Sequence, residues 1–108
     1  MNDEIEKLYK IILDRKASPE ENSYTAYLFS EGIDKILKKC GEEMTEVIIA
    51  AKNDDDSETI GEICDVLYHV LVMMAELNIS TDDVLKTLKQ RNEKMGNLKK
   101  KHQSDHLS

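Results

Sequence analysis

The sequence predicts an all-α protein, a bundle of four to five helices, and three observations lead to this prediction. The 108 residues include a single proline, four glycines and no tryptophan, a composition that favours long helices over a sheet-rich fold. Apolar residues recur at intervals of three and four, as on one face of a helix. Polar capping signals separate these stretches. We expect one helical domain over residues 1–98 and a basic, flexible tail over residues 99–108.

The first predicted helix runs from Asp3 to Leu13 and ends where the apolar pattern stops. Its apolar stripe consists of Ile5, Leu8, Tyr9 and Ile12. Residues 14–30 break the pattern, are rich in hydroxyl groups and turn formers, and contain the only proline. Because long ordered loops in compact domains are often functional, we expect an irregular segment with a binding role.

Two long amphipathic helices are predicted over residues 31–52 and 57–77. In the first, one arc of about 120° holds an apolar stripe: Ile33, Ile36, Leu37, Cys40, Met44, Val47, Ile48 and Ala51. In the second, the corresponding stripe is Ile60, Ile63, Cys64, Leu67, Leu71 and Met74. Both cysteines are therefore interpreted as reduced core residues. The second helix has a further apolar face at Val66, Val70 and Met73, which we expect to be buried in a dimer or larger oligomer.

Turn and capping signals define how these helices connect. Residues 53–56 form a short polar connection, in which Asp55 is a predicted N-cap followed by Glu58 at the N3 position. So short a connection favours an antiparallel helical hairpin. The sequence Ser80-Thr81-Asp82-Asp83 is a predicted capping box that opens one more helix.

Two carboxylate pairs at helical spacing lie beside the apolar stripes of the hairpin. They are Glu43 with Glu46, preceded by Glu42, and Glu62 with Asp65. Charges beside a core are costly unless something pairs with them, and the antiparallel hairpin brings the two pairs together. Carboxylate oxygens suit Mg²⁺, and also Mn²⁺. The alternative is that these acids lie on ordinary solvated helix faces.

Hydrogen-bond donors for a phosphate or ribose gather in the irregular segment. The candidates are Arg15, Lys16, Ser23, Tyr24 and Thr25, and the alternative is an ordinary turn with a helix cap. Lys39 lies between Glu43 and Glu46 in angle, so it is a candidate for holding their charges or for binding phosphate. Lys38, Lys52 and Asn53 are weaker candidates, because lysine near a helix C-terminus also complements the helix dipole. His69 shares the acidic strip, yet we expect a buried, hydrogen-bonded histidine rather than a metal ligand.

The overall charge and hydropathy limit the classes of partner. The formal net charge of −7 argues against a nucleic-acid backbone as the main partner. The N-terminus has no signal-peptide pattern, and no apolar run reaches the roughly 18 residues of a membrane span. We therefore expect a cytoplasmic protein with no membrane partner.

Several motifs together closely resemble the phosphoribosyl-ATP pyrophosphatase family. They are Asp14-Arg15-Lys16, Pro19, residues 23–28 (Ser-Tyr-Thr-Ala-Tyr-Leu), Gly32, residues 36–47 (Ile-Leu-Lys-Lys-Cys-Gly-Glu-Glu-Met-Thr-Glu-Val) and residues 65–69 (Asp-Val-Leu-Tyr-His). The resemblance covers about Ile5 to Leu88. The Ser-Tyr-Thr segment and Lys-Lys-x-Gly-Glu-Glu-x-x-Glu are specific to this family. The acid pairs alone are shared with the wider all-α nucleoside triphosphate pyrophosphohydrolases, the MazG-like and dimeric dUTPase relatives.

The resemblance implies a helical bundle of the all-α nucleoside triphosphate pyrophosphohydrolase type that is at least a dimer and requires magnesium. It also implies the second step of histidine biosynthesis, hydrolysis of phosphoribosyl-ATP to phosphoribosyl-AMP and pyrophosphate. Glu43, Glu46, Glu62 and Asp65 match the family's metal-binding carboxylates, and Glu42 matches the first acid of the motif. Many relatives carry a fused cyclohydrolase for the next step. For this shorter chain we expect a separate cyclohydrolase to act on the product.

The chemistry of the acids agrees with metal-assisted attack of water on the α–β phosphoanhydride. Glu42 or Glu46 is a candidate for accepting the proton of the water, and the sequence does not choose between them. Two other functions fit the same acids. One is a house-cleaning pyrophosphohydrolase acting on plain nucleoside triphosphates, and the other is a non-catalytic, metal-stabilised helical oligomer.

Overall fold

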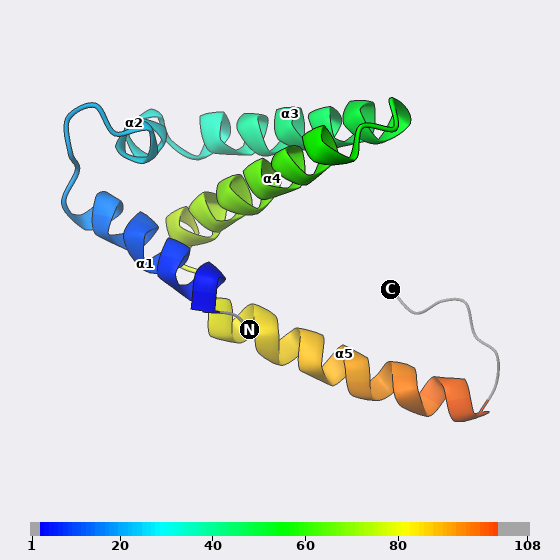
Figure 1. Cartoon of the computed structure of the whole chain (residues 1–108). Coiled ribbons are helices and arrows are strands. Elements are labelled where there is room, and N and C mark those ends of the chain that lie inside the picture. The colour runs from blue at the N-terminus through cyan, green and yellow to red at the C-terminus, as the bar shows by residue number, and fades with distance from the viewer. Residues whose placement is uncertain (1–2, 102–108) are drawn as a thin grey trace. The chain divides into compact units, whose positions relative to one another are not determined.

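The computed structural model describes residues 3–101, and these residues form five α-helices and no strand (Figure 1). The helices are α1 (Asp3–Ala17), α2 (Tyr24–Glu31), α3 (Ile33–Lys52), α4 (Asp56–Glu76) and α5 (Thr81–Lys101). The prediction of an all-α fold with four to five helices is confirmed. The chain divides into two compact units after Asn78, the first containing α1 to α4 and the second α5.

The segment over residues 14–30 is more regular than predicted. Helix α1 continues to Ala17, so Arg15 and Lys16 lie in its last turn. Residues 24–31 form α2, and the Ser23 hydroxyl caps it by accepting a hydrogen bond from the Ala26 N–H at 3.1 Å. The apolar stripe ends before the helix does, because polar residues with good helix propensity continue α1 to Ala17. Ser23 therefore matches the alternative interpretation of this segment, an ordinary turn with a helix cap.

A single glycine separates α2 from α3. Gly32 has φ +94° and ψ 179°, a backbone conformation that residues with a Cβ rarely adopt. Its N–H donates to the Leu28 carbonyl at 3.1 Å and closes the last turn of α2. The direction in which α2 leaves α3 is thus fixed at this residue.

Helices α3 and α4 form the antiparallel hairpin that the sequence predicts (Figure 1). Asp54 takes a positive φ of 57° in the short turn, and Asp55 is the N-cap of α4. The Asp55 Oδ1 accepts from the Glu58 N–H at 3.0 Å, as expected for an N-cap. The Ser80 hydroxyl accepts from the Asp83 N–H at 3.1 Å, so the predicted cap of α5 is also confirmed.

The buried core of the first unit lies at the end of the hairpin farthest from its turn. The side chains that are fully buried come from all four helices of the unit and are Ile12, Leu28, Ile36 and Val72. Toward the turn, the apolar side chains of the hairpin are poorly covered by other residues of the same chain. Met44, Ile48, Ile60 and Ile63 are each 45% exposed or more in the single chain.

This uneven burial corrects the prediction for Cys64, whereas burial of the Val66, Val70 and Met73 face in an oligomer stays a prediction. Cys64 is exposed rather than in the core, because the α4 stripe to which it belongs is not covered within one chain. Cys40, by contrast, is half-buried and donates from Sγ to the His69 carbonyl at 3.4 Å. Val66, Val70 and Met73 are half-buried, and the last two pack against the core of their own chain.

The predicted domain limits at residue 98 stay a prediction. Residues 99–101 of the predicted tail belong to α5, and the rest of it lies outside the described residues. None of the described helices combines the length and hydrophobicity that a membrane span requires.

Candidate functional site

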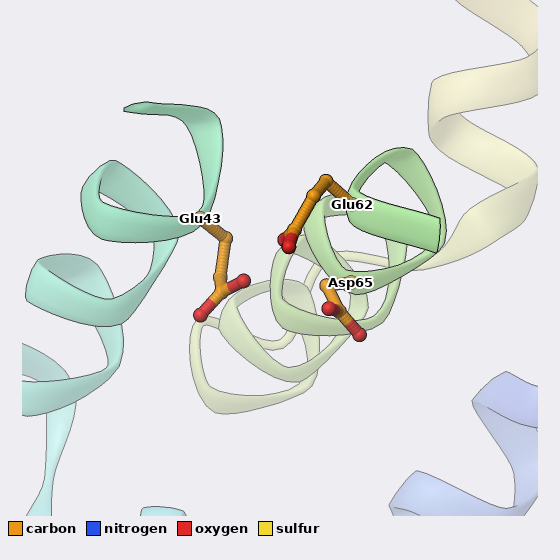
Figure 2. A group of neighbouring side chains, drawn as sticks. All are labelled: Glu43, Glu62 and Asp65. Atoms are coloured by element: carbon orange, nitrogen blue, oxygen red, sulfur yellow. The ribbon is translucent and has the colours of Figure 1, made fainter. Parts of the chain in front are cut away.

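Three carboxylates from the hairpin converge at its middle, and we call them the acid group: Glu43, Glu62 and Asp65. Figure 2 shows Glu43 on α3 facing the two acids of α4. Each residue offers one oxygen, and these oxygens lie within 4.8 Å of one another. Glu43 and Glu62 are half-buried and Asp65 is exposed, so the group is open to solvent on one side.

The proximity of like charges affects Glu62 most clearly. Partial burial, followed by the negative charges of Asp65, Glu43 and Glu46, raises the pKa of the Glu62 carboxyl. A carboxyl shifted in this direction takes up a proton at a higher pH than an ordinary glutamate, and a bound cation would oppose this shift. Glu46 is not within the acid group itself, but its charge acts on Glu62. The acid group could hold a hard divalent cation through oxygen atoms alone.

A hollow of about 270 Å³ lies beside the acid group, between α2 and the N-terminal half of α3. We call it the α2–α3 hollow, and its lining consists of Tyr24, Tyr27, Lys35, Lys38, Lys39 and Glu42. Three ammonium groups and two aromatic rings suit an anionic ligand with a planar or sugar part. Ligand pockets usually measure about 300–1,000 Å³, so the hollow has room for part of a nucleotide.

Lys39 links the hollow to the acid group. Its Nζ lies 3.3 Å from a Glu42 oxygen and 3.7 Å from a Glu43 oxygen. Burial by itself would lower the pKa of Lys39, but the hydrogen bond to Glu42 and the nearby negative groups raise it. Lys39 therefore stays a cation, and it holds two of the acids in the absence of a metal or phosphate.

Behind the hollow, α2 is tied to α4 by four side chains that we call the tyrosine–histidine network: Tyr24, Thr25, Tyr68 and His69. The Tyr24 hydroxyl lies 3.1 Å from His69 Nε2, and the Thr25 and Tyr68 hydroxyls are hydrogen-bonded to each other. Burial is the main cause that raises the pKa of Tyr24 and of Tyr68, so both phenols keep their protons. His69 is buried and hydrogen-bonded, as predicted.

The structure brings together only some of the predicted site residues. Glu43, Glu62 and Asp65 converge, and Tyr24, Lys39 and Glu42 line the hollow beside them. Apart from Lys38, the other predicted residues do not line the hollow. Arg15 lies 3.4 Å from Glu20, Lys16 Nζ donates to the Ala75 carbonyl at 2.8 Å, and Lys52 is exposed at the end of α3.

Two lining residues of the hollow, Tyr27 and Lys35, were not among the predicted site residues. The signal for Lys35 was present, because residues four apart share a helix face and Lys35 precedes Lys39 by four. Lys35 Nζ also lies 5.8 Å from the centre of the Tyr27 ring, a cation–π contact. Tyr27 gave no such signal, because residues 14–30 were expected to be irregular.

Comparison with known proteins identifies relatives along most of the chain. Residues 5–92 match the family described as Phosphoribosyl-ATP pyrophosphohydrolase. A phosphoribosyl-ATP pyrophosphatase of Clostridium novyi is 56% identical over 97 residues, which cover 90% of this chain and 88% of that protein. The enzyme of the same name from Clostridium acetobutylicum is 57% identical, over 91% of this chain and 89% of that protein. The one from Bacillus cereus is 50% identical over 99% of this chain and 100% of that protein. The chain belongs to the phosphoribosyl-ATP pyrophosphohydrolase family.

Proposed function

We propose that this protein hydrolyses phosphoribosyl-ATP to phosphoribosyl-AMP and pyrophosphate, the second step of histidine biosynthesis. The observation that supports this most directly is the acid group beside a basic, aromatic hollow, with Lys39 touching both. A triphosphate chain needs cations along its length, while a base and two riboses need apolar and hydrogen-bonding surfaces. The relatives that carry this name are 56% and 50% identical to the chain over 90% and 99% of its length.

The donor set of the acid group fits Mg²⁺, and Mn²⁺ as a substitute, because all its ligand atoms are carboxylate oxygens. Glu43, Glu62 and Asp65 would hold the cation, with Glu46 as a further ligand. When bound, Mg²⁺ neutralises phosphate charge and lowers the pKa of nearby water. Neither of the two thiols belongs to the group, which argues against zinc.

The residues of the chain then have separate roles. Lys39, with Lys35 and Lys38, binds phosphate oxygens in the hollow, and Tyr24 and Tyr27 contact the less polar part of the substrate. Glu46 or Glu42 accepts the proton of the attacking water. Glu46 is the better candidate, because Glu42 is already engaged in an ion pair with Lys39 at 3.3 Å.

Five further residues remain proposed substrate contacts, although none of them lines the hollow. Ser23 and Thr25 already serve as a helix cap and as a partner of Tyr68. Arg15, Lys16 and Lys52 do not line the hollow, and substitution of each tests its role in binding.

We also infer that the active form is a dimer or larger. Leu37, Met44 and Ile48 of α3 and Ile60, Ile63 and Leu67 of α4 are between 45% and 63% exposed in one chain. Exposed apolar stripes of this extent on a single chain are typical of surfaces covered by another subunit. A monomer by light scattering at micromolar concentration would contradict this inference.

Because the substrate and product belong to biosynthesis inside the cell, we propose a cytoplasmic location. The product phosphoribosyl-AMP would be the substrate of a cyclohydrolase. No role for nucleic acid or membrane is proposed.

The decisive experiment measures pyrophosphate release in Mg²⁺ from phosphoribosyl-ATP, ATP, dUTP and other nucleoside triphosphates, with a chelator control. We expect release from phosphoribosyl-ATP that the chelator abolishes. Preference for a plain triphosphate would assign the protein to the house-cleaning enzymes instead. No release from any substrate, with helices and metal binding intact, would support a metal-stabilised structural protein.

A further inference from the structure

His69 is a buried polar residue whose two ring nitrogens both have partners. It lies on α4 one turn after Asp65 and is 5% exposed. Its Nδ1 lies 2.7 Å from the Asp65 backbone carbonyl, and its Nε2 lies 3.1 Å from the Tyr24 hydroxyl. Its own carbonyl accepts the Cys40 Sγ–H. The ring is therefore fixed between the metal-binding helix and α2.

These partners determine where the protons lie. A carbonyl oxygen only accepts hydrogen bonds, so Nδ1 carries the proton that is donated to Asp65 O. In the neutral imidazole, Nε2 is then an acceptor, and the Tyr24 hydroxyl must donate to it. The hydroxyl proton of Tyr24 is thus directed at His69 and is not available to a ligand.

Aromatic packing holds Tyr24 in the same orientation. Its ring meets the His69 ring edge-on at 5.8 Å and stacks on the Tyr68 ring at 6.2 Å, both measured between centres. Tyr24 is also one of the residues that line the α2–α3 hollow, together with Lys35 and Lys39. His69 therefore controls what Tyr24 offers to the contents of the hollow.

We propose that His69 is a positioning residue that makes Tyr24 a hydrogen-bond acceptor for a ribose hydroxyl of the substrate. The inference rests on the proposed function and assigns chemistry within the same site. Phosphate oxygens only accept hydrogen bonds, so a phenol whose proton is already donated does not bind them. The lysines of the hollow supply those donors instead. Tyr24 thus contacts the ribose of the substrate, and the lysines contact its phosphates.

The hydrogen bonds can be tested without turnover, by nitrogen-15 NMR of the histidine ring in the full chain. We expect a protonated Nδ1 and an unprotonated Nε2 for His69, and a shift of the Nε2 signal on Tyr24→Phe. A protonated Nε2 in the neutral ring, or an Nε2 signal that Tyr24→Phe leaves unchanged, would overturn the proposal. This result does not depend on which nucleotide the protein hydrolyses.

Kinetics separates positioning from a purely structural role. In His69→Gln the amide oxygen reaches the Nε2 position and preserves a partner for Tyr24, whereas the shorter side chain in His69→Asn preserves only the local bond to Asp65 O. We expect Tyr24→Phe to raise KM for phosphoribosyl-ATP about three- to tenfold, the range for one hydrogen bond, with kcat changed less than about twofold. His69→Asn should raise KM by the same factor as Tyr24→Phe. His69→Gln should keep KM close to the wild-type value.

The double variant completes the test. Adding Tyr24→Phe to His69→Asn should cause no further rise in KM, because both changes remove one interaction. Additive losses, or equal losses in His69→Gln and His69→Asn, would show that His69 acts only through packing. Should His69→Asn fail to fold, Tyr24→Phe and His69→Gln still decide the question, since Tyr24 is 45% exposed. Absence of phosphoribosyl-ATP hydrolysis in the wild-type protein would refute the proposed function, and the NMR result would still decide the network.

Discussion

The acid group and the tyrosine–histidine network both depend on α4, yet they are in opposite electrostatic states. In the acid group, three carboxylates lie together with Lys39 as a nearby cation, and their repulsion contributes to the raised pKa of Glu62. In the network, each of the four side chains has a hydrogen-bond partner. The first region gathers negative charge that one lysine does not balance, whereas the second is paired within the chain. Removing a residue should therefore affect activity in the first and ligand affinity or stability in the second.

The largest expected effect is the loss of turnover in Glu62→Gln. The substitution keeps the shape of the side chain but removes a ligand charge from the acid group, and a metal contribution of several kcal/mol corresponds to a decrease in kcat of about a thousandfold. Helix content by circular dichroism should be unchanged. Glu58→Gln is the matched control, because it makes the same chemical change on an exposed residue one turn earlier in α4. Full activity in Glu62→Gln would remove Glu62 from the metal site.

The next effect in size tests whether the Lys16 ammonium binds substrate or only contacts groups of its own chain. Its Nζ donates to the Ala75 carbonyl near the C-terminal end of α4 and lies 5.9 Å from the centre of the Phe29 ring. In Lys16→Met we expect the free energy of unfolding to fall by about 1 kcal/mol, since the contact is only partly buried, with KM unchanged.

Urea unfolding and steady-state kinetics check this expectation, with Lys10→Met on the exposed face of α1 as the control. A rise in KM of tenfold or more, without loss of stability, would return Lys16 to the substrate site as the sequence analysis predicted.

The smallest expected effect is a pH dependence of the metal-free protein. Because the pKa of Glu62 is raised by folding, its contribution to stability is present below its unfolded pKa, about 4.3, and is lost as the pH rises through the folded value. With a chelator present, the stability of the wild type relative to Glu62→Gln should therefore decrease from about pH 4 toward pH 7.

Thermal unfolding of both proteins over this pH range measures the difference. Mg²⁺ added at neutral pH should raise the unfolding temperature of the wild type and leave that of Glu62→Gln almost unchanged, because only the wild type keeps all the proposed ligands. A wild type that gains stability relative to the variant as the pH rises would contradict the repulsion inferred for the acid group.

The sequence predicted the charged region better than the network. Glu43, Glu62 and Asp65 could be placed together because helical spacing, a short turn and an N-cap at Asp55 leave few ways to arrange the hairpin. The Tyr24–His69 pair joins residues 45 positions apart across helices whose mutual orientation periodicity does not reveal. Tyr27 was missed for a related reason: α2 has eight residues, too few for an apolar period to stand out.

The core was predicted correctly near α1 and incorrectly near the hairpin turn. Ile36, Leu71 and Met74 lie on their expected buried faces, whereas Leu37, Met44 and Cys64 share the same predicted stripes and are exposed in one chain. An apolar stripe indicates that a surface will be covered, but not whether the same chain or another provides the cover.

The positive φ of Gly32 has a consequence for how a substitution at the start of α3 would act. The glycine lies between the helix that carries Tyr24 and the helix that carries Glu43, and a Cβ at this position would meet no atom within 4 Å. Replacing it therefore costs backbone strain, about 1–3 kcal/mol, rather than a side-chain clash. This strain falls at the single residue that joins the helix of Tyr24 to the helix of Glu43, whereas Glu62 and Asp65 lie on a different helix, α4.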